Sequence, residues 1–139
     1  MSRFAFRLDK LLRYRTTLEK QAKDEYLARR AKRIEGEFEI EKIKGRRIDS
    51  LSFSSTTLPD RVAHERFLSR LDDEQRAVEA AVAVLQGEED VARGKWLVTK
   101  KDLEALQKLR EKDLEAWQLE EERKEQRALD EWAVLRRVA

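Results

Sequence analysis

The sequence predicts an all-α protein in which two long helices form an antiparallel coiled-coil hairpin and the second helix overhangs the first. Apolar residues recur at alternating spacings of three and four from Leu71 to Leu109. Ser and Thr gather in one short stretch before the single Pro, and 43% of the 139 residues are charged. So narrow an apolar seam needs a partner helix. Because the length is that of one domain, we expect the two helices to form a single domain over residues 1–139.

The second helix carries the longest heptad pattern in the chain. Its a positions are Gln75, Val82, Glu89, Trp96 and Leu103, and its d positions are Leu71, Val78, Leu85, Ala92, Thr99 and Leu106. The seam is apolar with polar interruptions. Five heptads within a highly charged background are typical of a coiled coil rather than of one wall of a globular core.

The first helix is expected over residues 4–50, because an apolar stripe with helical spacing runs through this range. Residues 51–58 form the predicted turn, since the helical pattern breaks there. Thr57 and Asp60 fit a capping box, which predicts a second helix over residues 59–137. A loop this short makes the two helices antiparallel.

The position of the turn also predicts how the helices pair. Antiparallel pairing about residues 51–58 places Phe4 near Leu106 and Tyr26 near Leu85. Beyond Leu109 the heptad seam fails, so we expect the last thirty or so residues to project alone, supported by charged pairs one turn apart.

Two tryptophans of this projecting segment, Trp117 and Trp132, lie where no intramolecular partner is expected. Self-association of the overhanging helices would cover them, but Trp is a common anchor at protein interfaces. We favour docking into another protein.

The distribution of charge separates the two halves of the chain. Residues 1–48 hold fifteen Lys and Arg against eight Asp and Glu, whereas residues 49–139 hold sixteen against twenty-one. The basic residues are interleaved with Glu rather than clustered, which favours attraction between two paired helices. Nucleic-acid binding by the basic first helix remains the alternative.

The composition offers few of the residues that catalysis or cofactor binding would need. The chain has no Cys, and its one histidine, His64, falls in the first turn of a predicted helix. We therefore expect no enzyme activity, no cofactor, no metal site and no small-molecule substrate. The start lacks an uninterrupted apolar run, and no other stretch is long enough to span a membrane, which predicts a cytosolic protein.

Both ends of the chain resemble one protein family. The motif FxFRLDKLLRYR at residues 4–15 and the stretch EALQKLREKDLEAWQLEEERKEQRALDEWA at residues 104–133 are similar to the ends of FliJ. FliJ is the small coiled-coil protein of the flagellar type III export apparatus, which serves motility. The similarity covers the whole length, including RFLSRL at residues 66–71.

The resemblance implies a hairpin similar to the central stalk subunit of rotary ATPases, with its paired termini inside the hexameric ring of the export ATPase FliI. It further implies that the protein promotes ring assembly and ATP turnover, contacts the export gate protein FlhA and handles export chaperones. Nucleic acid is not an expected partner. The implied location is cytoplasmic, peripheral to the inner membrane through the export apparatus.

Matching positions supply the implied site residues. The ATPase-facing end would comprise Leu8, Leu11, Leu12, Arg15, Glu121, Glu122, Arg123, Gln126, Leu129, Asp130 and Glu131, with Trp117 and Trp132 as the docking aromatics. Phe67 and Leu71 would face the gate protein, although the small residue expected near Glu74 is missing. The stalk protein of a virulence type III secretion system remains a near alternative.

Overall fold

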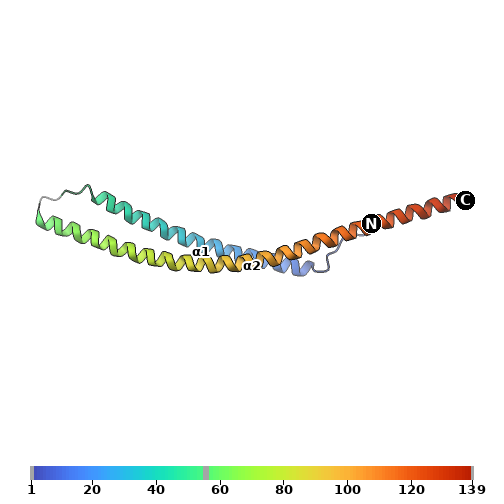
Figure 1. Ribbon diagram of the computed structural model, residues 1–139, viewed down its shortest axis with the longest axis horizontal. Helices are drawn as coiled ribbons and strands as arrows, with labels where there is room; N and C mark the ends of the chain where they lie inside the picture. Colours follow the sequence, from blue (N-terminus) through green and yellow to red (C-terminus); the bar gives the residue numbers. More distant parts are fainter. Residues whose placement is uncertain (1, 55–56, 139) are drawn as a thin grey trace. The chain divides into compact units, whose positions relative to one another are not determined.

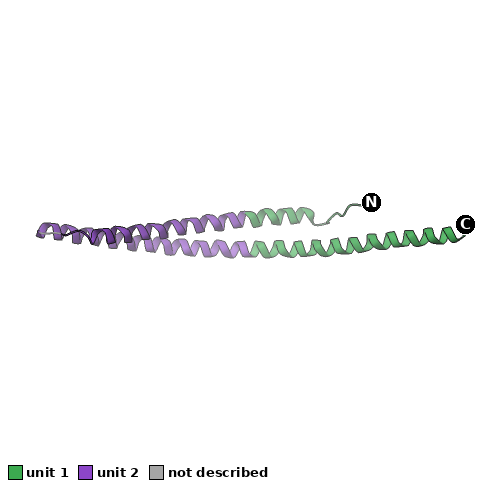
Figure 2. Ribbon diagram, turned by 90° about the horizontal axis from the view of Figure 1, so that it is seen from above, with its two compact units in different colours: residues 1–20, 98–139 green, residues 21–97 purple. Residues whose placement is uncertain are grey.

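The computed structural model describes residues 2–54 and 57–138, and contains two long helices, α1 (Asp9–Ser50) and α2 (Leu58–Val138), packed against each other (Figure 1). Within the described residues there is no strand. The predicted all-α antiparallel hairpin is thereby confirmed. Contacts divide the chain into unit 1, which is Met1–Lys20 with Val98–Ala139, and unit 2, which is Gln21–Leu97 (Figure 2).

Helix α1 begins at Asp9 rather than at residue 4. The Asp9 amide closes a turn by donating to the carbonyl of Phe6 at 3.1 Å, and the first helical bond runs from the Leu12 amide to the Leu8 carbonyl at 2.9 Å. The Asp9 carboxylate pairs with Arg13 at 3.1 Å and lies where the helix dipole favours negative charge. The predicted helical start is wrong, and residues 2–8 form a separate segment, which we call the arm.

The junction between the helices keeps the predicted capping residue. The Asp60 amide donates to Thr57 Oγ1 at 3.3 Å, which satisfies one of the free amides at the start of α2. At the other end, the Ser50 hydroxyl donates to the carbonyl of Arg47 at 2.7 Å in the last turn of α1. Residues 55 and 56 of the predicted turn lie outside the described part of the chain.

On α2 the core of unit 2 follows the predicted seam, whereas on α1 the spacing of apolar residues did not single out Ile43. Ile43 of α1 is fully buried, and Leu71 and Ala92 of α2 are buried opposite α1. Glu89 is also buried, with 5% of its surface exposed, although it is charged. Burial therefore follows the predicted heptad positions, polar ones included.

The pairing register of unit 2 differs from the predicted one. Tyr26 stacks on Trp96, with ring centroids 5.4 Å apart and planes 13° apart, and does not pair with Leu85. Leu85 instead lies near Gly36, where an added Cβ would meet Val82. The shift from Leu85 to Trp96 is eleven residues, about three helical turns, and it exchanges one seam position for another, so spacing alone could not choose between these registers.

The described residues on both sides of the junction fit this register. Phe53 packs against His64, with ring centroids 5.3 Å apart, so the chain after α1 runs beside the first turns of α2. Arg47 in the last turn of α1 pairs with Asp72, so the first turns of α2 run past the end of α1.

Four ion pairs that join the helices within unit 2 share the same arrangement of charges. In each of them an arginine of α1 meets a carboxylate of α2: Arg29 with Glu88, Arg33 with Glu89, Arg46 with Glu74 and Arg47 with Asp72. The pKa of Arg33 is raised, mainly by its hydrogen bond to Glu89 and then by its bond to Glu37. These pairs bear out the interpretation that the basic helix lies against an acidic one.

Candidate functional site

Unit 1 contains the two segments that the family resemblance assigns to the ATPase-facing end. Its parts are the arm, residues 9–20 of α1 and residues 98–138 of α2. Phe4, Phe6 and Leu8 of the arm are partly or fully buried, whereas the residues between them are exposed. This alternation has the period of an extended segment, not that of a helix. The same alternation in the sequence, FxFxL before Asp9, was the signal that the helical interpretation missed.

Trp117 has an intramolecular partner, contrary to prediction. Its ring lies 5.9 Å from that of Phe4 at an interplanar angle of 54°, a tilted arrangement favoured by aromatic pairs. The Arg110 guanidinium lies 5.6 Å from the centroid of the Phe4 ring, and the Ser2 hydroxyl donates to Glu121 Oε1 at 2.8 Å. The seam of α2, predicted to end at Leu109, is therefore covered as far as Glu121.

The arm is held by few interactions for its length. Burying a Phe or Leu side chain contributes about 1.5–3 kcal/mol, and the arm offers three such side chains. Fixing the backbone of one residue costs about 1–2 kcal/mol, and the arm has seven residues. The gain and the cost are thus of similar size, and attachment of the arm is close to balanced.

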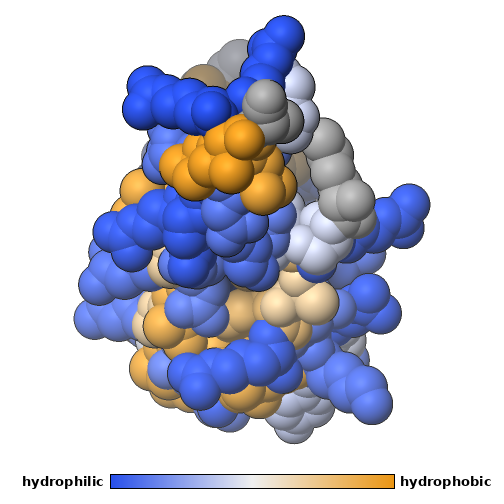
Figure 3. Space-filling view, turned by 90° about the vertical axis from the view of Figure 1, so that its right-hand side faces the viewer, coloured by the Kyte–Doolittle hydropathy of each residue, from blue (hydrophilic) through white to orange (hydrophobic). Residues whose placement is uncertain are grey.

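The end of α2 beyond Glu121 is exposed throughout residues 122–138. Ala128, Trp132 and Leu135, which we call the C-terminal stripe, fall on the same side of the helix as Trp117 and Glu121. Trp132 has 58% of its surface exposed, and Leu135 has 69%. Figure 3 faces the end of the molecule where α2 finishes and shows hydrophobic side chains open between hydrophilic ones.

Polar contacts along this segment stay within the helix. Arg127 pairs with Glu120 at 2.8 Å, Lys124 with Glu121 at 3.7 Å, the Gln126 amide donates to Asp130 at 3.1 Å, and the Arg136 guanidinium lies 4.7 Å from the Trp132 ring centroid. Those among them that join side chains three or four residues apart stabilise a helix by about 0.2–0.5 kcal/mol each. They support a helical end that lacks a packing partner, as the sequence predicted.

The proposed ATPase-facing residues fall into two groups within unit 1. One group lies at the start of α1, where Leu8 and Leu12 are partly buried, Leu11 is exposed and the Arg15 guanidinium binds Asp102 at 3.2 Å. The other group lies on the exposed end of α2: Glu122, Arg123, Gln126, Leu129, Asp130, Glu131 and Trp132. Trp117 and Glu121 lie between them, under the arm.

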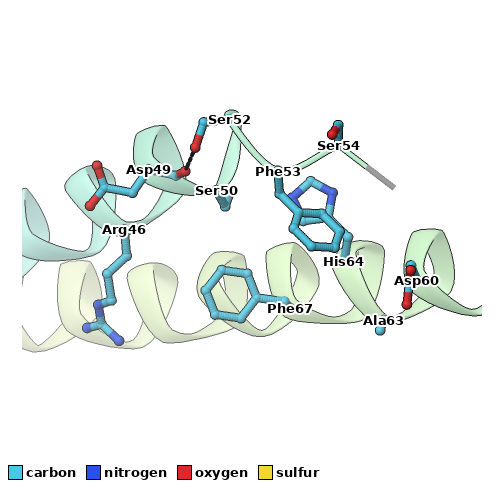
Figure 4. Close-up of a pocket in the computed structure, with 10 residues that line it drawn as sticks. All are labelled: Arg46, Asp49, Ser50, Ser52, Phe53, Ser54, Asp60, Ala63, His64 and Phe67. Carbon is cyan, nitrogen blue, oxygen red and sulfur yellow. Dashed lines mark hydrogen bonds between the residues drawn. The ribbon is translucent and has the colours of Figure 1, made fainter. Parts of the chain in front are cut away.

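A second candidate surface lies in unit 2, beside the loop. A groove of about 860 Å³ is lined by Arg46, Asp49, Ser50, Ser52, Phe53, Ser54, Asp60, Ala63, His64 and Phe67. Figure 4 shows Phe53 and His64 facing each other near Phe67. Phe67 is exposed, whereas Leu71 has 2% of its surface exposed and lies in the seam. Of the two proposed gate-facing residues, the structure thus presents Phe67 and covers Leu71.

In residues 2–54 and 57–138 no cluster of three or more His, Asp or Glu could hold a metal ion. None of the described helix residues forms a stretch long and apolar enough to cross a bilayer. What both surfaces offer is apolar and charged side chains on helices, which is the chemistry of protein contacts.

Comparison with known proteins identifies a family. A family model described as the flagellar FliJ protein matches residues 4–138, nearly the whole chain. No curated protein and no solved structure matches significantly.

Proposed function

The chain belongs to the flagellar FliJ family, a non-catalytic part of the export apparatus, and we propose that it is a stalk-like subunit binding the ring of the export ATPase. In this role it promotes ring assembly and ATP turnover. It also links the ring to the export gate protein and to export chaperones, at the cytoplasmic face of the inner membrane.

The exposed end of α2 carries the ATPase part of this proposal. Residues 122–138 are helical, and all of them are exposed. Among them, Leu129 and Trp132 each have more than half of their surface exposed. Large apolar side chains at such exposure are typical of interaction sites. Charges of both signs between them would suit the polar bore of a ring in which contacts are light.

The gate-binding part of the proposal places Phe67 at the contact, because it lies open in the groove beside the loop. Leu71 would act by holding α2 against α1 beneath that contact. A nucleic-acid role has weaker support, since arginines of α1 that face α2 are paired with carboxylates.

The proposal is tested by two matched aromatic substitutions. Trp132 and Tyr14 each have 58% of their surface exposed and both belong to unit 1, but only Trp132 is a proposed ATPase contact. Trp132→Ala should raise the concentration that half-maximally stimulates the export ATPase by about tenfold or more, as loss of an interface anchor does. Tyr14→Ala should leave it unchanged. Equal effects of the two substitutions would contradict the proposed contact.

A further inference from the structure

We propose that the arm is a strap that leaves α2 when the partner of the C-terminal stripe binds, and that the face it uncovers around Trp117 belongs to the same binding surface. The identity of that partner, the ring of the export ATPase, rests on the function proposed above. The release of the arm itself rests on the contacts of unit 1 alone.

The first support is the way in which the arm is attached. Its contacts with α2 include the Phe4 ring, which lies against Trp117 and Arg110, and one exposed hydrogen bond from Ser2 to Glu121, and Phe6 is buried. Among the described residues, the arm makes backbone hydrogen bonds only within its own turn and to the first turn of α1. It can therefore detach without breaking any backbone hydrogen bond to α2.

The second support is the continuity of the face beneath it. Trp117 and Glu121, which the arm covers, fall on one side of α2 with Ala128, Trp132 and Leu135, which are exposed. A partner that follows the C-terminal stripe along the helix meets the arm at Glu121. Because attachment of the arm is close to balanced, a partner with better apolar contacts can replace it.

Trp117 provides a direct readout of arm release. The natural chain has no Cys, so Ser2→Cys with Glu121→Cys gives a unique pair at the position of a 2.8 Å hydrogen bond. A short bis-methanethiosulfonate linker joins the pair and reductant releases it. With Trp96→Phe and Trp132→Phe added, Trp117 is the sole tryptophan, and acrylamide quenching should rise about twofold on release of the tether. Equal quenching in the two states would overturn the strap, whatever the partner does.

A second variant shifts the equilibrium the other way and does not need the tryptophan substitutions. Phe6→Ala removes the most buried anchor of the arm and should lower the concentration that half-maximally stimulates the ATPase. A rise in that concentration would show that the arm belongs to the binding surface, and would overturn its assignment as a strap.

The tethered protein completes the test with the partner present. With the arm tethered, the concentration needed for half-maximal stimulation should be about tenfold higher than that of the same double-cysteine protein after reduction. A control tether between Arg46→Cys and Glu74→Cys, which joins α1 to α2 in unit 2 and leaves the arm free, should have no effect. If tethered and released forms act alike, the strap is overturned and the proposed function stands. If the natural chain fails to stimulate the ATPase, the proposed function fails, and quenching alone decides whether the arm detaches.

Discussion

Glu89 shows how a single buried charge is accommodated in the seam. It occupies an a position, where the sequence led us to expect an interruption. The structure instead gives it the guanidinium of Arg33, which also donates to Glu37 at 2.8 Å. These bonds raise the pKa of Arg33 above its ordinary value. Because the folded-state pKa is the higher one, the stability that comes from the charge of Arg33 is lost as the pH rises through that folded-state pKa.

The two partners should differ when removed singly. Arg33→Leu leaves a nearly buried carboxylate without its partner, whereas Glu89→Leu leaves an arginine that retains Glu37. We expect Arg33→Leu to lower the melting temperature more than Glu89→Leu does, and the double substitution to recover part of the loss. Arg46→Leu, which breaks a pair with both side chains about half exposed, is the control and should change little. Additive effects of the two single substitutions, measured by circular dichroism, would contradict the coupling.

Glycines provide a second comparison at this scale. A Cβ at Gly36 would lie 2.7 Å from Val82 Cγ2, on a side chain with little rotational freedom, whereas a Cβ at Gly87 or Gly94 would meet nothing within 4 Å. Gly36→Ala should destabilise the protein by about 1–3 kcal/mol through overpacking. Gly87→Ala and Gly94→Ala should each stabilise it by about 0.5–1 kcal/mol, since Ala loses less backbone freedom in a helix. Urea unfolding measures all three, and stabilisation by Gly36→Ala would contradict the close approach of the helices there.

At the scale of the elements, the spacing of apolar residues predicted α2 because a heptad pattern is local and long. Leu71, Ala92 and Leu103 are buried where it placed them. The arm was not predicted, because Phe4 and Leu8 fit a helical spacing of four as well as an extended spacing of two. The register was not predicted either, because it depends on the loop and on pairs such as Arg33 with Glu89, which lie far apart in sequence.

Attachment of α1 to α2 should depend on few side chains. Ile43 is fully buried, while Ile48, five residues further along the same helix, has 66% of its surface exposed. Ile43→Ala should cost about 2–5 kcal/mol of unfolding free energy, as large-to-small core substitutions do. Ile48→Ala has the same chemistry without the burial and should stay within about 0.5 kcal/mol of the natural chain. A small effect at both positions would show that the seam near the loop contributes little.

At the scale of the whole molecule, the proposed partner surfaces belong to different units: the ATPase-facing residues to unit 1 and Phe67 to unit 2. Sequence motifs indicated both: the strings at the two ends of the chain indicated the first surface, and RFLSRL at residues 66–71 indicated the second. What the motifs could not indicate is exposure. Trp117 and Trp132 occur in the same string, yet Trp117 lies under Phe4 and Trp132 is open to solvent.

The exposed end of α2 should be separable from the fold. Residues 122–138 are exposed along their whole length, so ending the chain after Glu121 removes no buried side chain and keeps both contacts of the arm with Trp117 and Glu121. The shortened chain should therefore unfold at nearly the same temperature as the natural chain and lose helical signal only in proportion to the residues removed. It should nevertheless fail to stimulate the export ATPase, because Leu129 and the C-terminal stripe are gone. Circular dichroism and ATP turnover measured on the same sample decide the matter. Stimulation equal to that of the full-length chain would show that the ATPase contact lies elsewhere in unit 1, and a lowered melting temperature would show that the end of α2 contributes to the fold.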